Sequence, residues 1–391
     1  MITSLGVKNF KSLKDVSLKL GPRTVFVGPN MGGKSNLISV FRFLNQLVLG
    51  APGVHGLAHA VNNQGGFAEM AWRGADLNTV AFEIEGVLKG PAEAIPWHYS
   101  LDLLGDRARG LVTIQEERLS GKFGDSEVAL LETDHRTGRR VIRRASGDTV
   151  TEIDDVRRSG LEFELPDWEG NILKHAFATF QFFTLVPHVM KQVNPSSAPS
   201  FLTETGNNLS SWLMMLQTRY DQEYARITSA LKDVFPEFLN LYTWPTPQAT
   251  VFLASAERNL KSPVPVWQMS DGELCFIALL SLLFAPEEFG APLYCIEEPE
   301  NHLHPRMLKV LVELHDQRQR ELDSQVAQLL ATTHSPIFVD QLNIADVVVV
   351  FKRDGATHCV RPSDKPHLRE ILASEEMGLG DLIYSGALAD E

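Results

Sequence analysis

The chain of 391 residues carries a formal net charge of −13, with 44% apolar and 22% charged residues. Such a chain is globular and can bury a sizeable core, either as two or three modest domains or as one elaborated nucleotide-binding head. The acidic balance argues against a protein that is basic over its whole surface, so any contact with DNA needs a local patch.

No run reaches the roughly 18 apolar residues of a membrane span, and the longest, at 274–285, is interrupted by Ser281. Lys8, Lys11 and Lys14 break up any hydrophobic region of the kind found in a signal peptide. We therefore expect a cytoplasmic protein that does not contact a membrane. The three cysteines lie far apart in apolar settings, which predicts buried thiols and no disulfide or metal site.

Residues 2–20 are predicted to form two strands around a turn. A short apolar strand at 24–27 then leads into a glycine-rich turn and a helix whose apolar stripe ends near residue 50. The turn matches Gly-x4-Gly-Lys-Ser, the P-loop, in which backbone N–H groups close around phosphates, Lys34 reaches the β- and γ-oxygens and the Ser35 hydroxyl binds Mg2+. Nucleotide contacts are expected from Asn30, Gly32, Gly33, Lys34, Ser35 and Asn36.

From 79 to about 165 the chain has mostly period-two alternation broken by turn signals, which predicts an antiparallel meander. Arginines crowd into its middle part. They are consistent with a solvated hairpin or with a patch that contacts the phosphates of DNA, and the second interpretation predicts salt-sensitive binding. The arginines are Arg136, Arg139, Arg140, Arg143 and Arg144.

Proline, serine and asparagine mark 192–208 as a linker or mobile loop, after which helical periodicity returns over 209–235. From 267 onward we expect alternating helices and strands: helix 271–284, strand 293–297, helix 305–322, strands 326–332 and 346–351, and a last helix near 366–373. These patterns divide the chain into lobe I at 1–188, a linker with a helical insertion at 189–266, and lobe II at 267–391.

A P-loop needs a second strand that carries carboxylates, and the apolar strand 293–297 ends in Glu297 and Glu298. Glu297 is expected to hold Mg2+ through water, and Glu298 to polarise the attacking water as a general base. A solvated acidic turn is the plain alternative for these two residues, and the presence of a P-loop argues against it.

Ser270, Asp271, Gly272 and Glu273 begin an apolar helix, where Ser270 and Glu273 fit a capping box. A serine and a glycine at a helix N-terminus also form an anion site, here for a γ-phosphate presented by another subunit. His334 follows the strand 326–332 directly, where it can hydrogen-bond the γ-phosphate or the attacking water.

In this order, the motifs resemble the ABC-type ATPase heads of the RecF, SMC and OLD group. The likeness is closest to stand-alone bacterial predicted AAA-family ATPases related to OLD ATPase domains, and it covers about 1–90 and 200–391. It implies an α/β P-loop NTPase fold, an ABC-type two-lobed head with an antiparallel β subdomain and a helical insertion. It also implies that two heads enclose ATP and Mg2+ in a homodimer.

Carried over residue by residue, the resemblance assigns Lys34 and Ser35 to phosphate and Mg2+, and Glu298 to catalysis. It assigns Ser270 and Gly272 to the γ-phosphate in the facing subunit and His334 to a switch. Lys11 lies where such heads place a basic residue near the nucleotide. Two departures from the family pattern are that Glu297 replaces the commoner Asp and that Glu273 stands where many signatures have Gln or Thr. Gln64 and Gln181 both remain candidates for the glutamine loop.

The P-loop is also similar to that of MutS mismatch-repair ATPases, but the segments around Glu298 and His334 are not. OLD proteins append a Toprim nuclease after the switch histidine, and the 57 residues after His334 leave no room for one, so a nuclease is expected on a separate chain. The first hypothesis is an ATPase that acts on DNA in genome maintenance or anti-phage defence with an effector partner. The second is a nucleotide-gated regulatory or scaffold module that binds a protein partner, and a transporter ATPase is a remote third.

Overall fold

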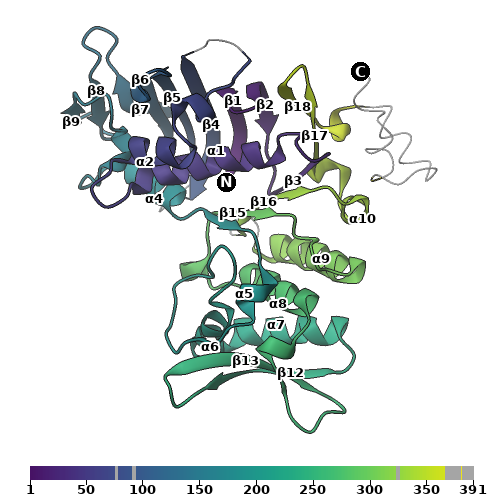
Figure 1. Ribbon diagram of the computed structural model, residues 1–391. Coiled ribbons are helices and arrows are strands. Elements are labelled where there is room, and N and C mark those ends of the chain that lie inside the picture. The colour runs from purple at the N-terminus through teal and green to yellow at the C-terminus, as the bar shows by residue number, and fades with distance from the viewer. Residues whose placement is uncertain (75–77, 90–93, 323–325, 366–379, 381–391) are drawn as a thin grey trace.

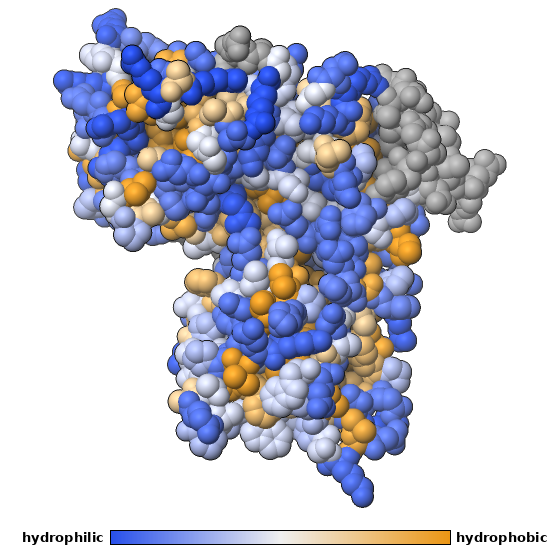
Figure 2. Space-filling model, in the orientation of Figure 1, coloured by the Kyte–Doolittle hydropathy of each residue, from blue (hydrophilic) through white to orange (hydrophobic). Residues whose placement is uncertain are grey.

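The computed structural model describes residues 1–74, 78–89, 94–322, 326–365 and 380. They form three β-sheets with helices packed around them (Figure 1). In this view, a wide upper part holds the two larger sheets and a narrower lower part holds the smallest sheet. Hydrophilic side chains cover most of the face shown in Figure 2. Among the described residues, no helix is both long and apolar enough to cross a membrane.

The largest sheet has eight strands, all antiparallel, in the order β2-β1-β4-β5-β6-β7-β8-β9. The predicted meander is confirmed as β4 to β9, and the two N-terminal strands extend it by pairing β1 with β4. Its strands are β1 (Ile2–Phe10), β2 (Leu13–Lys19), β4 (Thr79–Lys89), β5 (Ala94–Asp106), β6 (Leu111–Phe123), β7 (Ser126–Thr133), β8 (Arg140–Arg143) and β9 (Thr149–Ile153).

The second sheet has six strands in the order β10-β15-β16-β3-β17-β18, and all except the last pair in parallel. Its strands are β3 (Arg23–Val27), β10 (Gln181–Phe183), β15 (Leu293–Glu297), β16 (Gln328–Thr333), β17 (Val347–Arg353) and β18 (Ala356–Val360). Parallel strands present their carboxyl ends at one edge, which is where ligands bind in open α/β sheets.

This sheet joins segments that the sequence analysis divided between lobe I and lobe II. β3 comes from the first and β15, β16 and β17 come from the second, yet β16 pairs directly with β3. The apolar runs predicted these strands individually. Periodicity, however, does not indicate which strands will pair with each other in a parallel sheet. The sheet therefore combines strands from both sides of the predicted boundaries at 188 and 267, within what was predicted as one composite ATPase head.

Helix α1 (Lys34–Leu49) lies between the two large sheets. Phe43 of α1 stacks on Phe82 of β4 with ring centroids 4.9 Å apart, and Phe26 of β3 and Leu330 of β16 join the same core. Alternate residues of β3 point to the opposite face, where they pack against α9 (Pro305–Leu322) and α10 (Pro336–Val339). Shorter helices α2 (Gly56–Asn63), α3 (Phe67–Met70) and α4 (Gly170–Ala178) complete the upper part.

The lower part has its own hydrophobic core. The predicted helices of 209–235 are present as α6 and α7, but the same region also holds strands that the sequence analysis did not predict. Its elements are α5 (Pro187–Met190), β11 (Asn194–Pro195), α6 (Leu209–Arg219), α7 (Asp221–Val234), β12 (Phe238–Pro245), β13 (Thr250–Glu257), β14 (Val264–Pro265) and α8 (Asp271–Leu283). The helix expected near 366–373 lies outside the described residues. All three cysteines are free thiols, with Cys275 and Cys295 buried and Cys359 partly buried.

One buried side chain ties the two large sheets together at the end away from the P-loop. The Gln328 amide accepts from the Ile2 N–H at 2.8 Å and donates to the carbonyl oxygens of Ile2 and Gly21 at 2.7 and 2.8 Å. Gln328 begins β16 and is only 2% exposed, so water cannot replace these bonds.

Replacing Gln328 with Leu should lower the free energy of unfolding by about 2–4 kcal/mol, because buried backbone groups of Ile2 and Gly21 lose their partners. Urea denaturation followed by circular dichroism measures this loss. The control is Gln317→Leu on exposed α9 surface, expected to change stability by no more than about 0.5 kcal/mol. Equal effects of the two substitutions would contradict the assigned role of Gln328.

Candidate functional site

The P-loop connects β3 to α1 and packs against the backbone of the neighbouring strands. A Cβ at Gly28 would collide with the carbonyl oxygen of Val350 in β17, so only glycine fits there. Gly33 has φ 109° and lies against Thr357 of β18, which again excludes a side chain. These contacts fix the glycine positions. No side chain caps the first turn of α1; the Asn36 N–H donates to the Gly33 carbonyl oxygen at 3.0 Å, which leaves the N–H groups of Lys34 and Ser35 for an anion.

Lys34 folds back over this loop. Its ammonium donates to the carbonyl oxygens of Gly28 at 2.7 Å and Pro29 at 3.0 Å, and the side chain is buried. Burial lowers the pKa of Lys34, while the carboxylates of Glu298 and Glu300 act in the opposite direction. The positive charge is thus held inside the concave face of the loop and opposite two acids.

The carboxyl end of β15 brings an acid to the first turn of α1. The Ser35 hydroxyl donates to Glu297 Oε2 at 2.8 Å, joining residues that are 262 positions apart. The two side chains offer the hard oxygen ligands that Mg2+ prefers, so the donor set fits this ion. No group of three or more His, Cys, Asp or Glu side chains in the described part of the chain could hold a metal, so the remaining ligands would be phosphate and water oxygens.

Glu298 follows Glu297 with φ 49°, in the left-handed region that costs a non-glycine residue about 1–3 kcal/mol. The conformation is held by its N–H, which donates to the Thr332 carbonyl oxygen at 2.9 Å, and by Asn301 Nδ2, which donates to Glu298 Oε2 at 3.0 Å. His334 Nδ1 lies 3.2 Å from Glu298 Oε1. The two residues predicted as base and switch therefore form one pair at the edge of the sheet.

Glu300 is a site residue that the sequence analysis did not assign. One of its carboxylate oxygens accepts from the Thr333 hydroxyl and from the His334 N–H at 3.2 Å, and the side chain is only 8% exposed. It thereby fixes the start of the segment that carries His334. The sequence shows an acid at this position, but the same residue fits a solvated turn, so only the contacts with Thr333 and His334 reveal its role.

The turn between β1 and β2 lies beside the first turns of α1. Lys11 has φ 51°, and its ammonium donates to the Ser39 hydroxyl at 3.1 Å. Burial lowers the pKa of Lys11, Arg42 adds to this effect and Glu297 opposes it. Asn36 donates to the Ser12 hydroxyl at 2.6 Å, which ties α1 to the same turn, whereas Asn30 is exposed at the tip of the P-loop.

Ser270 and Gly272 lie at the start of α8, in the lower part of the molecule (Figure 1). The Ser270 hydroxyl accepts from the Glu273 N–H at 3.2 Å, as the capping pattern predicts. A Cβ at Gly272 would collide with the His302 carbonyl oxygen, so this helix start packs tightly on the segment that follows Glu298. Within the described chain, Ser270 and Gly272 make no hydrogen bond to the P-loop.

The two candidates for the glutamine loop lie on different elements. Gln181 begins β10 and pairs with Tyr294, while Phe183 pairs with Ile296. Gln181 therefore lies toward the amino end of the strands, away from Glu297. Gln64 ends α2 and is buried.

The arginine cluster of the meander is largely neutralised. Arg140 is only 1% exposed and forms an ion pair with the buried Glu117, so it cannot contact DNA, and its assignment to a DNA patch is wrong. Arg139 pairs with Glu152 and Asp154, and Arg143 with Glu132. Arg144 donates to the carbonyl oxygens of Pro166 and Asp167, and Arg136 is exposed. The cluster mainly holds the meander together.

Comparison with known proteins identifies the fold. Residues 181–340 match the family model AAA_21, described as an AAA domain, putative AbiEii toxin, Type IV TA system. The chain is 24% identical over 397 residues to an OLD nuclease of Thermus scotoductus (strain ATCC 700910 / SA-01), covering 97% of this chain and 68% of that protein.

Solved structures of SMC heads are similar over nearly their whole length. An SmcHead bound to the C-winged helix domain of ScpA has a TM-score of 0.57 at 15% identity, covering 92% of this chain and 97% of the other. An Smc head from Pyrococcus furiosus with an extended coiled coil, bound to the C-terminal domain of ScpA, has a TM-score of 0.50 at 14% identity, covering 95% and 99%. The chain thus has the α/β P-loop fold of an ABC-type ATPase head, similar to SMC heads and to an OLD nuclease, as the sequence motifs predicted.

Glu273, in the first turn of α8, has a raised pKa. Burial raises the pKa of Glu273 to about 7, and the nearby Glu257 carboxylate adds to the rise, against hydrogen bonds from Ser255 and the Ser270 N–H. In the unfolded chain the same carboxyl titrates near 4.5. The folded state therefore binds more protons than the unfolded state between these pH values, and stability falls as the pH rises through this window.

Glu273→Gln removes this titration, so the stability of the variant relative to the wild type should increase from pH 5 to pH 8, by at most about 3 kcal/mol. Melting curves recorded at several pH values test this expectation. Glu313→Gln, at an exposed carboxyl of α9, serves as the control and should show no such trend. A relative stability of Glu273→Gln that does not change with pH would contradict the assignment.

Proposed function

We propose that this chain binds ATP with Mg2+ and hydrolyses it, and that two copies close around two ATP molecules in a head-to-tail homodimer. The observation that carries the proposal is the contact of Ser35 with Glu297, which joins the P-loop to the acidic strand end. The adjacent pair of Glu298 and His334 supplies a base and a second polar group at the same edge.

The residues divide the chemistry between them. Lys34 and the first N–H groups of α1 bind the β- and γ-phosphates, and Ser35 and Glu297 hold Mg2+, which neutralises phosphate charge. Glu298 orients and polarises the attacking water, and its left-handed backbone directs the carboxylate toward His334. His334 contacts Glu298 and follows a segment anchored by Glu300, so it can report whether the γ-phosphate is present.

The dimer is supported by the position of the α8 N-terminus. Ser270 is exposed and is the N-cap residue of α8. Within the described residues it makes no hydrogen bond to the P-loop of its own chain. A helix N-terminus with an exposed serine hydroxyl, whose proton is still available to donate, suits an anion. In the proposed dimer, Ser270 and Gly272 meet the γ-phosphate bound to the P-loop of the other copy.

Glu298→Gln should bind ATP without hydrolysing it and should therefore accumulate as a dimer, because the amide cannot activate water. Light scattering after size-exclusion chromatography compares its mass with and without ATP. Lys34→Ala is the matched control and should remain monomeric under both conditions, since it loses the phosphate contact. If Glu298→Gln stays a monomer in ATP, the proposed dimer is wrong.

The shared site can be tested by mixing two inactive variants. Lys34→Ala lacks its own phosphate contact, whereas Ser270→Asp keeps the helix cap and places a negative charge opposite the γ-phosphate. A mixed dimer has one intact site, made of the P-loop of the Ser270→Asp copy and the α8 N-terminus of the Lys34→Ala copy. Recovery of ATPase activity on mixing is expected, and its absence, with both variants folded, would contradict sharing.

For the output of the cycle, we infer coupling to DNA transactions through a separate effector chain, in genome maintenance or anti-phage defence. Similarity to an OLD nuclease over 97% of the chain supports this role. The second candidate is a nucleotide-gated module that binds a protein partner. The neutralised arginine cluster favours it, as do the SMC heads that are bound to ScpA.

Duplex DNA should stimulate ATP hydrolysis if the first role holds, and the stimulation should fade between about 50 and 200 mM salt as phosphate contacts are screened. Phosphate release measured with and without DNA decides between the roles. Arg136→Ala, at an exposed arginine of the cluster, tests whether the meander contributes. Activity indifferent to DNA at all salt concentrations would favour the regulatory module.

A further inference from the structure

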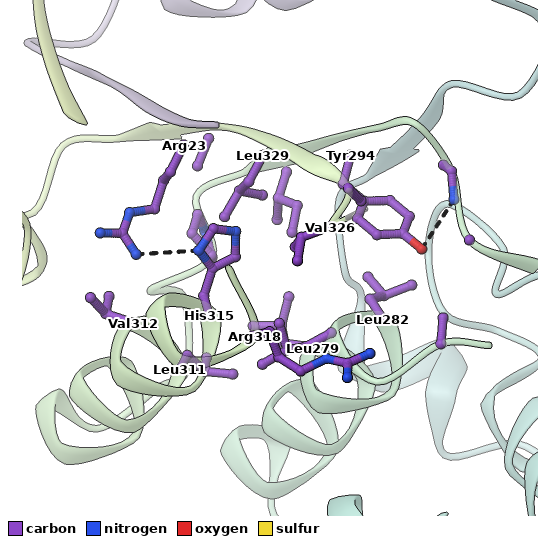
Figure 3. Close-up of a pocket in the computed structure, with 18 of the residues that line it drawn as sticks. Arg23, Leu279, Leu282, Tyr294, Leu311, Val312, His315, Arg318, Val326 and Leu329 are labelled. Carbon is purple, nitrogen blue, oxygen red and sulfur yellow. Dashed lines mark hydrogen bonds between the residues drawn. The ribbon is translucent and has the colours of Figure 1, made fainter. Parts of the chain in front are cut away.

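A large cavity lies below the six-stranded sheet, on the face opposite α1. It has a volume of about 510 Å3 and is bounded by β15 and β16 above and by α8 and α9 below (Figure 3). This volume falls in the range of pockets that hold small organic molecules. It opens on the face of the sheet opposite α1, and its lining extends along β15 from Pro292 before the strand to Ile296 and Pro299, beside Glu297 and Glu298.

The walls are mainly apolar. Leu279 and Leu282 of α8, Leu311 of α9 and Leu329 of β16 line the space, and Tyr294 of β15 closes one end, where its hydroxyl accepts from the Ala291 N–H at 3.3 Å. Apolar walls of this extent favour an apolar ligand body.

His315 presents an unpaired hydrogen-bond donor to this space. Arg23 Nη1 lies 3.4 Å from His315 Nδ1, and a guanidinium can only donate, so Nδ1 accepts. Burial lowers the pKa of His315 to about 4, and the charge of Arg23 acts in the same direction, against Asp316. The ring is therefore neutral at pH 7 and carries its proton on Nε2. That atom is buried without a partner in the described chain, and the side chain is only 6% exposed.

Arg318 adds a positive charge one helical turn further along α9. Its Nε is also buried without a hydrogen-bond partner, and its guanidinium lies 4.0 Å from Glu321 and 5.7 Å from the centre of the Phe284 ring. Glu321 and Glu223 balance part of this charge, but at longer range than Asp316 and Asp346 balance Arg23, at 2.7 and 2.6 Å. Buried donors are almost always paired in folded proteins, so two orphans facing one cavity indicate an acceptor from outside the chain.

We propose that this cavity binds an amphiphilic anion, with an apolar body against α8 and the sheet and a carboxylate or similar acidic head between His315 Nε2 and Arg318. The neutral imidazole N–H and the guanidinium both donate, which matches an acceptor-only head group. Polyphosphate ligands do not fit, because they need more donors and fewer apolar walls. β15 and β16 form the roof of the cavity and end at Glu297 and Thr333, so bound ligand would also stiffen the strands that lead to the ATPase site.

Titration with 8-anilinonaphthalene-1-sulfonate, an apolar fluorophore with an anionic head, tests the proposal without ATP. We expect one site per chain, displaced by decanoate about tenfold more strongly than by decan-1-ol, since the alcohol cannot pair with Arg318. Equal displacement by the two competitors would overturn the assignment of the head group.

Two variants locate the site. Ala327→Trp fills the cavity, and Arg318→Met keeps the apolar stem but removes the charge, so each should weaken fluorophore binding about tenfold. Arg320→Met, at an exposed position of the same helix, is the matched control and should bind like the wild type. Melting curves establish that each variant is folded. Unchanged affinity in either folded cavity variant would overturn the proposal.

Discussion

The parallel register of β3, β16 and β15 is the constraint on which the candidate site depends. Thr333 pairs with Val27 and Thr332 pairs with Glu297, so the three strands end level with one another. Only this alignment brings the P-loop, the acidic pair and His334 to one edge, although they are separated by up to 300 residues. Gln328 fixes the other end of β16 against β1, so the register is held at both ends.

The candidate site also depends on helix α1, which both packs in the core and positions the P-loop. α1 buries Phe41, Phe43 and Leu44 between the two large sheets, while its N-terminus stays accessible at the P-loop. The packing energy of its apolar side chains fixes the position of the loop, so the loop can tolerate conformations that are unfavourable by themselves. Met31 of the P-loop, at φ 66°, is such a residue, and Glu298, at φ 49° after β15, is a second left-handed residue at the same edge of the sheet.

Local patterns in the sequence predicted the elements of this fold well. The P-loop, the acidic strand end, the cap of α8 and the strands of the meander all follow from short-range chemistry of capping, glycine placement and alternation. The sequence could not show that β16 inserts between β3 and β15, that Glu300 turns inward to hold His334, or that Arg140 is buried against Glu117. Each of these features depends on contacts between segments that are distant in the sequence. The sequence alone does not distinguish a charged residue that is solvated from one that is buried in an ion pair.

Two buried polar atoms without a partner in the described chain lie next to the six-stranded sheet, one near each proposed site. Glu300 Oε2 lies near the P-loop edge, and His315 Nε2 faces the cavity on the opposite side of the strands. A buried polar group without a partner costs about 1–3 kcal/mol, and a fold retains such a cost when something outside the chain removes it. The proposed closed nucleotide site would supply donors to the Glu300 carboxylate, and the proposed acidic ligand would supply an acceptor to His315 Nε2. The same sheet thus borders one proposed site that needs hydrogen-bond donors and another that needs an acceptor. Its strands run between the two sites, so ligand binding at one can affect the other.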